Sequence, residues 1–314
     1  MKVLTLDIGG ANIKKVLFSN GKIKKRLYYF PIWKKKYELK KFLENISENS
    51  EIVAVTTTAE LSDIFESKEE GAKFILNTCT EVFENPYFLS IQKKLLPPEE
   101  LKPIEIAAAN FVASIYYMEK RYKEGIMVDM GSTTTDIIPF REGEDLYGKT
   151  DVERILKSQL IYTGMLRTPL NTIVHRVPFK NRMVRISSEF FAITADLYTV
   201  LGYIAEYPCD APDNRGKDPE SCRRRIARLL CADLEDIEEE LEGICEFIKN
   251  EQVRIIAQGI ERVSNDYGIS KVYACGIGEK IIKEACDKIG INYKSLGIKY
   301  LPNYGLYDMI LDKF

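Results

Sequence analysis

Two short Asp-x-Gly sequences are the parts of this chain best suited to chemistry on an anion. Glycine allows close backbone approach and unusual φ angles, so several N–H groups can converge on one negatively charged ligand. Hydroxyl and amide side chains add donors, and an aspartate beside a phosphate commonly binds magnesium. We therefore expect two turns that grip a polyphosphate from opposite sides, with Mg²⁺ on Asp7 and Asp129. The expected anion-binding residues are Asp7, Gly9, Gly10, Asn12, Lys14, Gly131, Ser132, Thr133, Thr134 and Asp136.

The two turns belong to an internal repeat. Residues 4–18 read LTLDIGGANIKKVLF and residues 126–140 read IMVDMGSTTTDIIPF. Asp7 matches Asp129 and Gly9 matches Gly131 at one offset, which is the size of a domain. Self-similarity at that spacing indicates two related lobes.

The elements that must position the turns follow from hydrophobic periodicity. The first segment predicts strands over 2–7, 13–19 and 22–30, with Asn20-Gly21 as a hairpin turn. Further along we expect helices over 37–46, 67–83, 104–121, 188–204, 233–267 and 279–289, and strands over 51–56, 87–91, 125–130, 134–140 and 271–275. We divide the chain into a first lobe, 1–122, a second lobe with a helical insertion, 123–303, and a C-terminal helix, 304–314, that packs on the first lobe.

A third glycine turn follows the strand near residue 275. Gly276 and Gly278 lie just before a helix, where a flat or charged ligand could approach the helix N-terminus. We count both among the ligand-binding residues.

Composition excludes several classes of function. The formal charge of −2 gives no sign of a nucleic-acid face or a polybasic membrane patch. Seven cysteines without C-x-x-C, and a single histidine, His175, argue against a zinc site and for reduced thiols. No signal peptide or membrane-spanning run is evident. We expect a cytoplasmic protein that acts on small molecules, with oligomerisation open.

The order of these motifs resembles the actin, sugar kinase and Hsp70 superfamily. LTLDIGGANIKKVLF is similar to its first phosphate loop, MVDMGSTTTDI to its second, and VYACGIGEK to its adenosine loop. This resemblance implies an α/β fold of two duplicated RNase H-like lobes, the actin-like ATPase fold, with an interlobe cleft. The Gly-Ser-Thr-Thr-Thr-Asp sequence and Thr163-Gly164-Met165-Leu166-Arg167-Thr168-Pro169 resemble the hydantoinase and oxoprolinase branch.

Within that branch the chain resembles a small archaeal family of methanofuran-biosynthesis synthases. The marks are Thr58-Ala59-Glu60-Leu61, Thr194-Ala195-Asp196 and the loop Asp213-Asn214-Arg215-Gly216-Lys217. The resemblance implies a transferase that condenses a furanylmethyl diphosphate with the phenol of γ-glutamyltyramine and releases diphosphate. Asn214 stands where we expect glycine, and asparagine supplies a positive φ less well.

The catalytic residues expected from these marks are Glu60, Asp196, Asp213 and Arg215. Glu60 or Asp196 could deprotonate the phenol, and Arg215 with Lys217 could close over the diphosphate. Plainer alternatives stay open. Glu60 could cap a helix, Asp213 and Arg215 could form a simple turn, Asp136 could face solvent, and Trp33 suits core packing better than an aromatic wall.

Two other functions fit the same motifs. One is an ATP-dependent kinase or amide-processing enzyme, with ATP at Gly276 and Gly278. The other is a non-enzymatic nucleotide switch, which the short chain makes less suitable because such proteins usually carry a large extra domain. Consumption of ATP would distinguish the first from the transferase.

Overall fold

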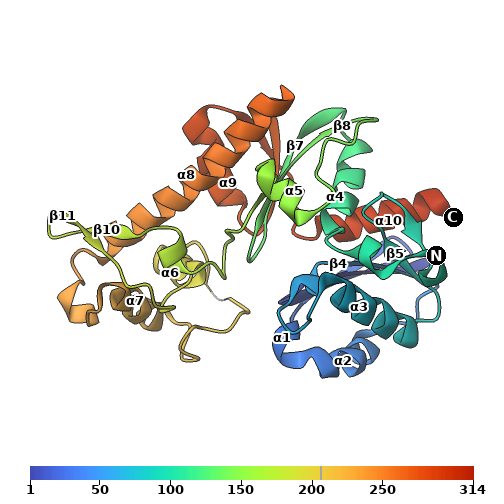
Figure 1. Ribbon diagram of the computed structural model, residues 1–314, viewed down its shortest axis with the longest axis horizontal. Coiled ribbons are helices and arrows are strands. Elements are labelled where there is room, and N and C mark those ends of the chain that lie inside the picture. Colours follow the sequence, from blue (N-terminus) through green and yellow to red (C-terminus); the bar gives the residue numbers. More distant parts are fainter. Residues whose placement is uncertain (206) are drawn as a thin grey trace.

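The computed structural model describes residues 1–205 and 207–314, and it shows two lobes that are each built on one main sheet (Figure 1). The first sheet has the spatial order β3-β2-β1-β4-β5-β6. Its strands are β1 (Lys2–Ile8), β2 (Asn12–Ser19), β3 (Lys22–Tyr29), β4 (Ile52–Thr57), β5 (Pro86–Leu89) and β6 (Leu95–Leu96).

The second sheet repeats the first. Its strands are β7 (Glu124–Met130), β8 (Thr135–Arg141), β9 (Leu160–Ile161), β12 (Lys271–Gly276) and β13 (Asn292–Ser295), in the order β13-β12-β7-β8-β9. In each lobe the first strand pairs antiparallel with the second and parallel with the fourth: β1 with β2 and β4, β7 with β8 and β12. This shared topology agrees with the duplicated α/β architecture expected from the repeat.

Strand alternation decides which face of β1 each side chain occupies. Leu4, Leu6 and Ile8 pack into a core with α2 (Leu39–Ile46) and α3 (Lys68–Val82). The odd-numbered side chains point the other way, and Val3 joins a core shared with the second lobe. Asp7 therefore lies on the face of the sheet that looks toward the second lobe.

Two helices lie between the sheets and connect the lobes (Figure 1). They are α4 (Asn110–Glu119) and α10 (Leu301–Lys313), and their apolar residues share one core with Met127 and Phe140 of the second sheet. Helix α10 begins three residues before the expected start and packs on β1 and α4. Asn303 fixes it by donating to the Thr5 and Lys14 carbonyls, at 3.0 and 3.2 Å.

The helix expected over 104–121 is interrupted. A 3₁₀ turn covers Pro103–Ile106, and α4 starts only at Asn110. Between them Ala108 has φ 51°, and its N–H donates to Glu60 Oε1 at 2.8 Å. The single-helix prediction was wrong because a tertiary hydrogen bond takes an amide that a continuous helix would have used.

A helical insertion extends the second lobe toward the left of Figure 1. It holds the hairpin β10 (Arg176–Phe179) and β11 (Arg182–Arg185), α6 (Thr194–Val200) and α7 (Pro219–Ala227), and α8 (Leu241–Tyr267) runs from it back to the second sheet. The helix expected over 188–204 starts only at Thr194. Leu170 N–H donates to Ala192 O and Thr194 N–H donates to Thr168 O, and these bonds hold residues 192–194 extended beside residues 168–170. The helix expected from residue 233 begins at Leu241, after a 3₁₀ turn.

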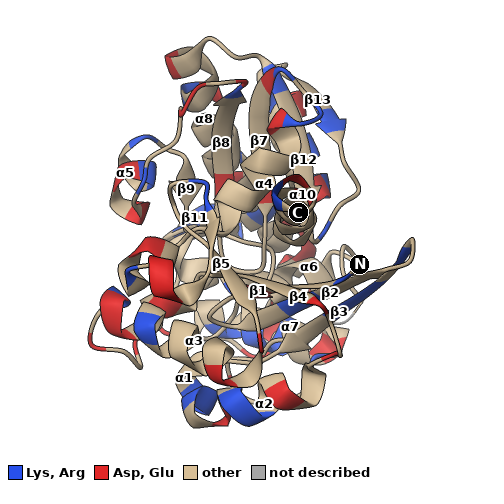
Figure 2. Cartoon of the chain, turned by 90° about the vertical axis from the view of Figure 1, so that its right-hand side faces the viewer, with Lys and Arg blue, Asp and Glu red and all other residues tan. Residues whose placement is uncertain are grey.

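Lysine and arginine side chains lie along β3, the edge strand of the first sheet (Figure 2). Such charges discourage another strand from pairing with the edge. No helix in the described ranges is both long and apolar enough to cross a membrane.

Candidate functional site

The two Asp-x-Gly turns have the same backbone geometry. Gly9 N–H donates to Asn12 O at 2.9 Å, and Gly131 N–H donates to Thr134 O at 2.9 Å. These donors and acceptors match at the offset of the repeat. The expected unusual φ angles are absent, because Gly9, Gly10 and Gly131 all lie outside the positive-φ region. The turns close through this hydrogen bond with ordinary φ.

A flanking segment ties back the carbonyl groups of the first turn. Gly10 O accepts from Ile32 N–H and Ala11 O accepts from Phe30 N–H, both at 2.9 Å. In a planar trans peptide the next N–H points opposite to the carbonyl. Ala11 N–H therefore points away from residues 30–32, and it has no protein acceptor in the described structure.

The second turn is held in the same way. Gly131 O accepts from Met165 N–H at 2.9 Å, and Ser132 O accepts from Arg167 N–H at 2.9 Å. Gly164 allows this packing, because a Cβ there would lie 2.5 Å from Thr133 N. The amides of Ser132 and Thr133 consequently point away from the supporting segment, as an anion-binding nest requires.

Side chains bring the two turns together. Asn12 Nδ2 donates to Ser132 Oγ at 3.3 Å across the lobes. Lys14 pairs with buried Asp7 at 3.1 Å. Burial opposes the charge of Lys14, but Asp7 and Asp129 outweigh it and raise the pKa of the ammonium. Lys14 is thus a positive charge shared by the aspartates of both lobes. We call Asp7, Asn12, Lys14, Asp129 and Ser132 the interlobe site.

Asp129 is the less satisfied of the two aspartates. It accepts no hydrogen bond from an N–H or O–H group of residues 1–205 and 207–314, whereas Asp7 has Lys14. Burial, with Asp136 and Asp7 nearby, raises the pKa of Asp129 to about 6, against the lowering effect of Lys14. Asp136 lies opposite it on β8 and binds Arg154 at 2.6 Å. Asp136 therefore belongs to the interlobe site rather than to a solvent face.

These carboxylates fit magnesium only with help from a ligand. In the described parts of the chain no three His, Cys, Asp or Glu side chains are grouped to hold a metal alone. Mg²⁺ usually binds through one or two carboxylates plus phosphate oxygens and water. Asp129, which lacks a cationic partner of its own, suits that arrangement better than Asp7.

Glu60 occupies a buried position where β4 ends. It lies in a 3₁₀ turn, Ala59–Leu61, and is 2 % exposed. Its Oε1 accepts from Ala108 N–H, and its Oε2 has no partner in the described structure. Burial raises the pKa of Glu60 to about 7; nearby Asp151 adds to the rise and Lys68 opposes it. A carboxyl group with a pKa near neutrality suits proton transfer.

Charged residues connect the surroundings of Glu60 to Asp136. Lys68 at the start of α3 binds Asp151 on α5 (Asp151–Leu156) at 2.6 Å. Arg154 on α5 binds Asp151 and Asp136, each at 2.6 Å, and its guanidinium covers the ring of Phe111 on α4. Sequence reasoning missed this chain of ion pairs, since nothing in the spacing brings α3 to α5.

Asp196 is fully buried on α6 and already has several partners. It accepts from Arg225 Nη2 at 2.7 Å, from the Tyr207 hydroxyl at 3.0 Å and from Ile193 N–H at 3.0 Å. This geometry suits a residue that fixes α6 to α7. It leaves Glu60 as the better placed of the two expected bases.

The loop over 213–217 lies on the insertion. Asp213 accepts from Arg215 N–H and from Arg225, both at 3.0 Å. Asn214 has φ 56°, so the turn does require the left-handed conformation that glycine favours. Lys217 contacts Tyr207. Within the described residues none of these side chains makes a hydrogen bond or an ion pair with either Asp-x-Gly turn.

The Gly276–Gly278 turn packs on the end of β7. Gly276 has φ 88°, and a Cβ there would lie 2.3 Å from Asp129 Oδ1. Ile277 and Gly278 N–H both donate to Met130 O, at 3.0 and 3.1 Å. Close packing beside Asp129 accounts for glycine at 276, and these two amides are already used before helix α9 (Glu279–Ile289) starts.

Trp33 and Arg167 meet across the lobes. The guanidinium of Arg167 lies 4.5 Å from the ring centre of Trp33 on α1 (Ile32–Lys35), and its Nη1 donates to Thr133 Oγ1 at 3.3 Å. Trp33 is half-buried, so it is not the fully buried core side chain that was expected. Arg167 was missed as a site residue, although the sequence around it had been noted.

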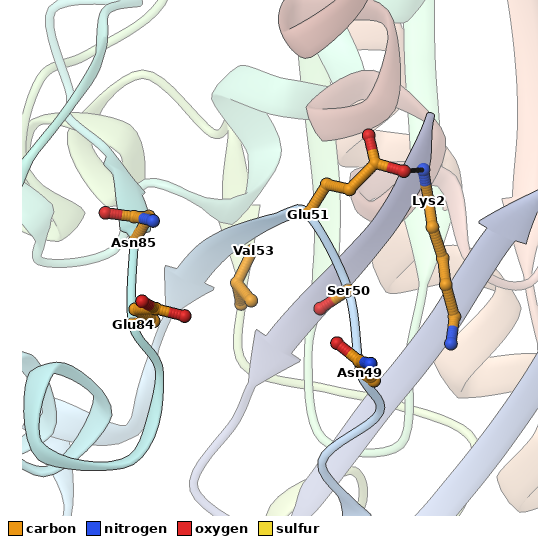
Figure 3. Close-up of a pocket in the computed structure, with 7 residues that line it drawn as sticks. All are labelled: Lys2, Asn49, Ser50, Glu51, Val53, Glu84 and Asn85. Atoms are coloured by element: carbon orange, nitrogen blue, oxygen red, sulfur yellow. Dashed lines mark hydrogen bonds between the residues drawn. The ribbon is translucent and has the colours of Figure 1, made fainter.

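A surface pocket of about 500 Å³ lies elsewhere (Figure 3). Lys2, Glu51 and Val53 line it, so it lies where β1 and β4 begin. Ligands of open α/β sheets bind at the carboxyl ends of the strands, where Asp7 and Glu60 lie. This pocket is at the wrong end of the sheet for the chemistry.

Known proteins resemble this chain in sequence and in fold. A curated relative from Methanocaldococcus jannaschii, named "(4-{4-[2-(gamma-L-glutamylamino)ethyl]phenoxymethyl}furan-2-yl)methanamine synthase", is 39 % identical over 92 % of this chain and 90 % of its own length. A relative of the same name from Methanococcus vannielii is 40 % identical over 53 % of this chain and 77 % of its own length.

Solved structures share the architecture. A nucleotide-free acetone carboxylase has a TM-score of 0.58 at 9 % identity, covering 98 % of this chain and 70 % of that one. A ROK family glucokinase from Streptomyces griseus, in complex with glucose and AMPPNP, has a TM-score of 0.51 at 12 % identity, covering 98 % and 99 %. At these identities they show the fold alone, which is that of the actin-like ATPases and sugar kinases.

The sequence profile of the hydantoinase/oxoprolinase family matches residues 51–299, from β4 to beyond β13. That range includes the second Asp-x-Gly turn, its supporting segment and Glu60. With its duplicated lobes and its close relatives, this chain belongs to the hydantoinase/oxoprolinase family.

Proposed function

We propose that this protein is a transferase of methanofuran biosynthesis. It condenses 5-(aminomethyl)-3-furanmethanol diphosphate with γ-glutamyltyramine, forming an aryl ether and releasing diphosphate. The observation that carries the proposal is the 39 % identity, over 92 % of the chain, to a protein named for the synthesis of this ether.

The reaction requires one bond to break and one to form. The bond between the furanylmethyl carbon and the diphosphate oxygen breaks, and its electron pair leaves with the diphosphate. The phenol oxygen bonds to that carbon and its proton passes to a base. Because the furan ring stabilises the developing cation, the main task of the protein is to neutralise the leaving group.

The two turns suit that task. The amides of Ala11, Ser132 and Thr133, which have no acceptor in the described structure, would bind diphosphate oxygens, and Lys14 would supply a positive charge. Asp129, with Asp136 beside it, would hold Mg²⁺, which when bound adds further positive charge at the leaving group. ATP is not a reactant in this proposal.

Glu60 is our candidate base for the phenol. A free phenol has a pKa of about 10, so it needs a neighbouring acceptor to react at neutral pH. Glu60 has an unpartnered buried oxygen and a pKa raised to about 7. Arg215 and Lys217 would act by closing the loop over 213–217 onto the diphosphate, a movement of the kind that shields active sites from water.

One incubation separates this function from its alternatives. Purified protein with Mg²⁺ receives either the furan diphosphate plus γ-glutamyltyramine, or ATP with candidate small-molecule acceptors. We expect ether and diphosphate in equal amounts in the first mixture, and no ADP in the second. ADP formation without ether would instead support the kinase or amide-processing alternative. The Glu60→Gln variant is the control for background solvolysis.

A further inference from the structure

Trp33 is tied to the first turn and Arg167 to the second. Ile32, whose N–H binds Gly10 O, directly precedes Trp33 in the chain. Arg167 binds Ser132 O through its own N–H and Thr133 Oγ1 through its guanidinium. Their contact at 4.5 Å is therefore a link between the two anion-binding turns.

The ring face of Trp33 already accepts a cation. A guanidinium over an indole ring is held by the negative face of the ring system. Arg167 forms no salt bridge with a carboxylate among residues 1–205 and 207–314, while the neighbouring Lys34 pairs with Asp210 at 2.7 Å. Arg167 is consequently free to exchange Trp33 for a stronger, anionic partner.

The spacing suits a substrate that carries a flat ring beside a diphosphate. The guanidinium of Arg167 donates to Thr133 Oγ1 in the second turn and also lies over the ring of Trp33. The Trp33 ring is therefore separated from the second turn by the width of one guanidinium group. In a furanylmethyl diphosphate, one oxygen and one methylene separate the ring from the nearest phosphorus. A diphosphate bound at the turns would place its ring within reach of Trp33.

We propose that Trp33 is the subsite for the furan ring and that Arg167 exchanges partners during binding. Arg167 leaves the indole for the diphosphate, and the furan ring takes its place on the Trp33 face. When the carbon–oxygen bond breaks, the positive charge that develops on the ring meets the indole face that Arg167 had occupied. This inference rests on the proposed function.

The first test uses inorganic pyrophosphate with Mg²⁺ and needs no turnover. Trp33 is the only tryptophan of the chain, so its fluorescence reports on this contact alone. We expect a saturable change in emission for the wild type. Arg167→Ala should show no such change, although calorimetry still detects pyrophosphate binding weakened by about tenfold. Binding to the wild type without any change in emission would overturn the partner exchange. No binding at all would overturn the diphosphate site itself, and with it the proposed function.

The second test separates catalysis from packing. Trp33→Leu should lower kcat about 30-fold and Trp33→Phe about fivefold, with KM for the furan diphosphate changed less than threefold, because the indole acts on charge that develops during the reaction. Tyr37→Leu is the matched control, since Tyr37 is an exposed aromatic residue of the same lobe, and kcat should not change. Equal losses in Trp33→Leu and Trp33→Phe, or a loss confined to KM, would contradict a role in the transition state. Thermal unfolding of each variant checks that the fold is kept.

Discussion

The two Asp-x-Gly hairpins have the same backbone and different charges. Each closes through the same hydrogen bond and has its carbonyl groups tied back by a flanking segment. Across the hairpin, however, Asp7 faces Lys14, whereas Asp129 faces Asp136 at the equivalent position. Asp136 is neutralised by Arg154, a residue with no counterpart in the first hairpin.

This difference shows how two copies of one hairpin can come to have different electrostatic properties. Anion binding by amides depends on backbone geometry, which both copies keep. A diphosphate with magnesium also needs one wall that is positive and one that can hold a cation. In the proposed function Lys14 would provide the first and Asp129 with Asp136 the second, so that the two copies would take different parts in binding.

Replacement of Asp129 should give the largest effect. We expect Asp129→Asn to lower kcat/KM by about 10³-fold. A metal bound at Asp129 would stabilise the negative charge of the transition state by several kcal/mol. Asp136→Asn is the matched comparison within the same hairpin. It should cost only about tenfold, since Asp136 is already paired with Arg154. Steady-state kinetics over a range of Mg²⁺ concentrations measures both, and equal losses would mean that the two carboxylates share one role.

Glu60 lies outside the repeat, and the residue at the same offset in the second lobe is Arg182. Glu60→Gln should lower kcat by about 10²- to 10³-fold and remove the acidic limb of the pH profile. For the wild type that limb should rise through pH 7, because burial raises the pKa of Glu60 to about 7 and only the ionised form accepts a proton. A limb that persists unchanged in the variant would assign the base elsewhere.

Glu60→Gln should lower activity but raise the stability of the fold at high pH. Because the folded protein raises the pKa of Glu60 above the unfolded value of about 4.3, its stabilising effect is complete below pH 4 and disappears as pH rises through 7. Glu60→Gln, which stays neutral, should thus be more stable than the wild type at pH 8, by about 3–4 kcal/mol, since one pKa unit corresponds to about 1.4 kcal/mol. Denaturant unfolding at pH 5 and pH 8 measures this, and the gain should shrink at the lower pH.

Lys14→Met tests the positive wall of the site. We expect KM for the diphosphate substrate to rise about 50-fold and inhibition by pyrophosphate to weaken by a similar factor, with a smaller change in kcat. Loss of one charge-assisted contact to a phosphate is typically worth 1.5–3 kcal/mol. Lys25→Met, an exposed lysine on β3, is the control. If pyrophosphate inhibition is unchanged in Lys14→Met, the division of charge between the hairpins is wrong.

Asn12→Ala should give the smallest effect. It removes the hydrogen bond to Ser132 that joins the turns, so we expect about a fivefold rise in KM, in line with one neutral hydrogen bond. The equivalent Thr134→Ala should change KM less than twofold, because the Thr134 side chain makes no bond across the lobes in the described structure. Similar losses in both variants would indicate that the side chains act alike and that the asymmetry lies in Lys14 alone.

Local pattern accounts for much of the fold and for the centre of the site. The repeat predicted two lobes and placed Asp7 and Asp129 at equivalent turns, because strand alternation and turn residues act over a few positions. The prediction of a single helix over 104–121 was wrong because a contact distant in the sequence overrides the local pattern. Ala108 has a helix-forming sequence around it, and only Glu60, 48 residues away in the chain, takes its amide.

The sequence by itself determined the paired hairpins, the strands that carry them and the identity of most groups that could bind an anion. Only the tertiary structure decided the partners of those groups: that Lys14 lies near two aspartates, that Asp196 is bound by Arg225, that Glu60 Oε2 has no partner among the described residues, and that Arg167 covers Trp33. The physical reason is range. Hydrogen-bonding turns and alternation are local, whereas ion pairs and burial depend on which distant segments the packed cores bring together.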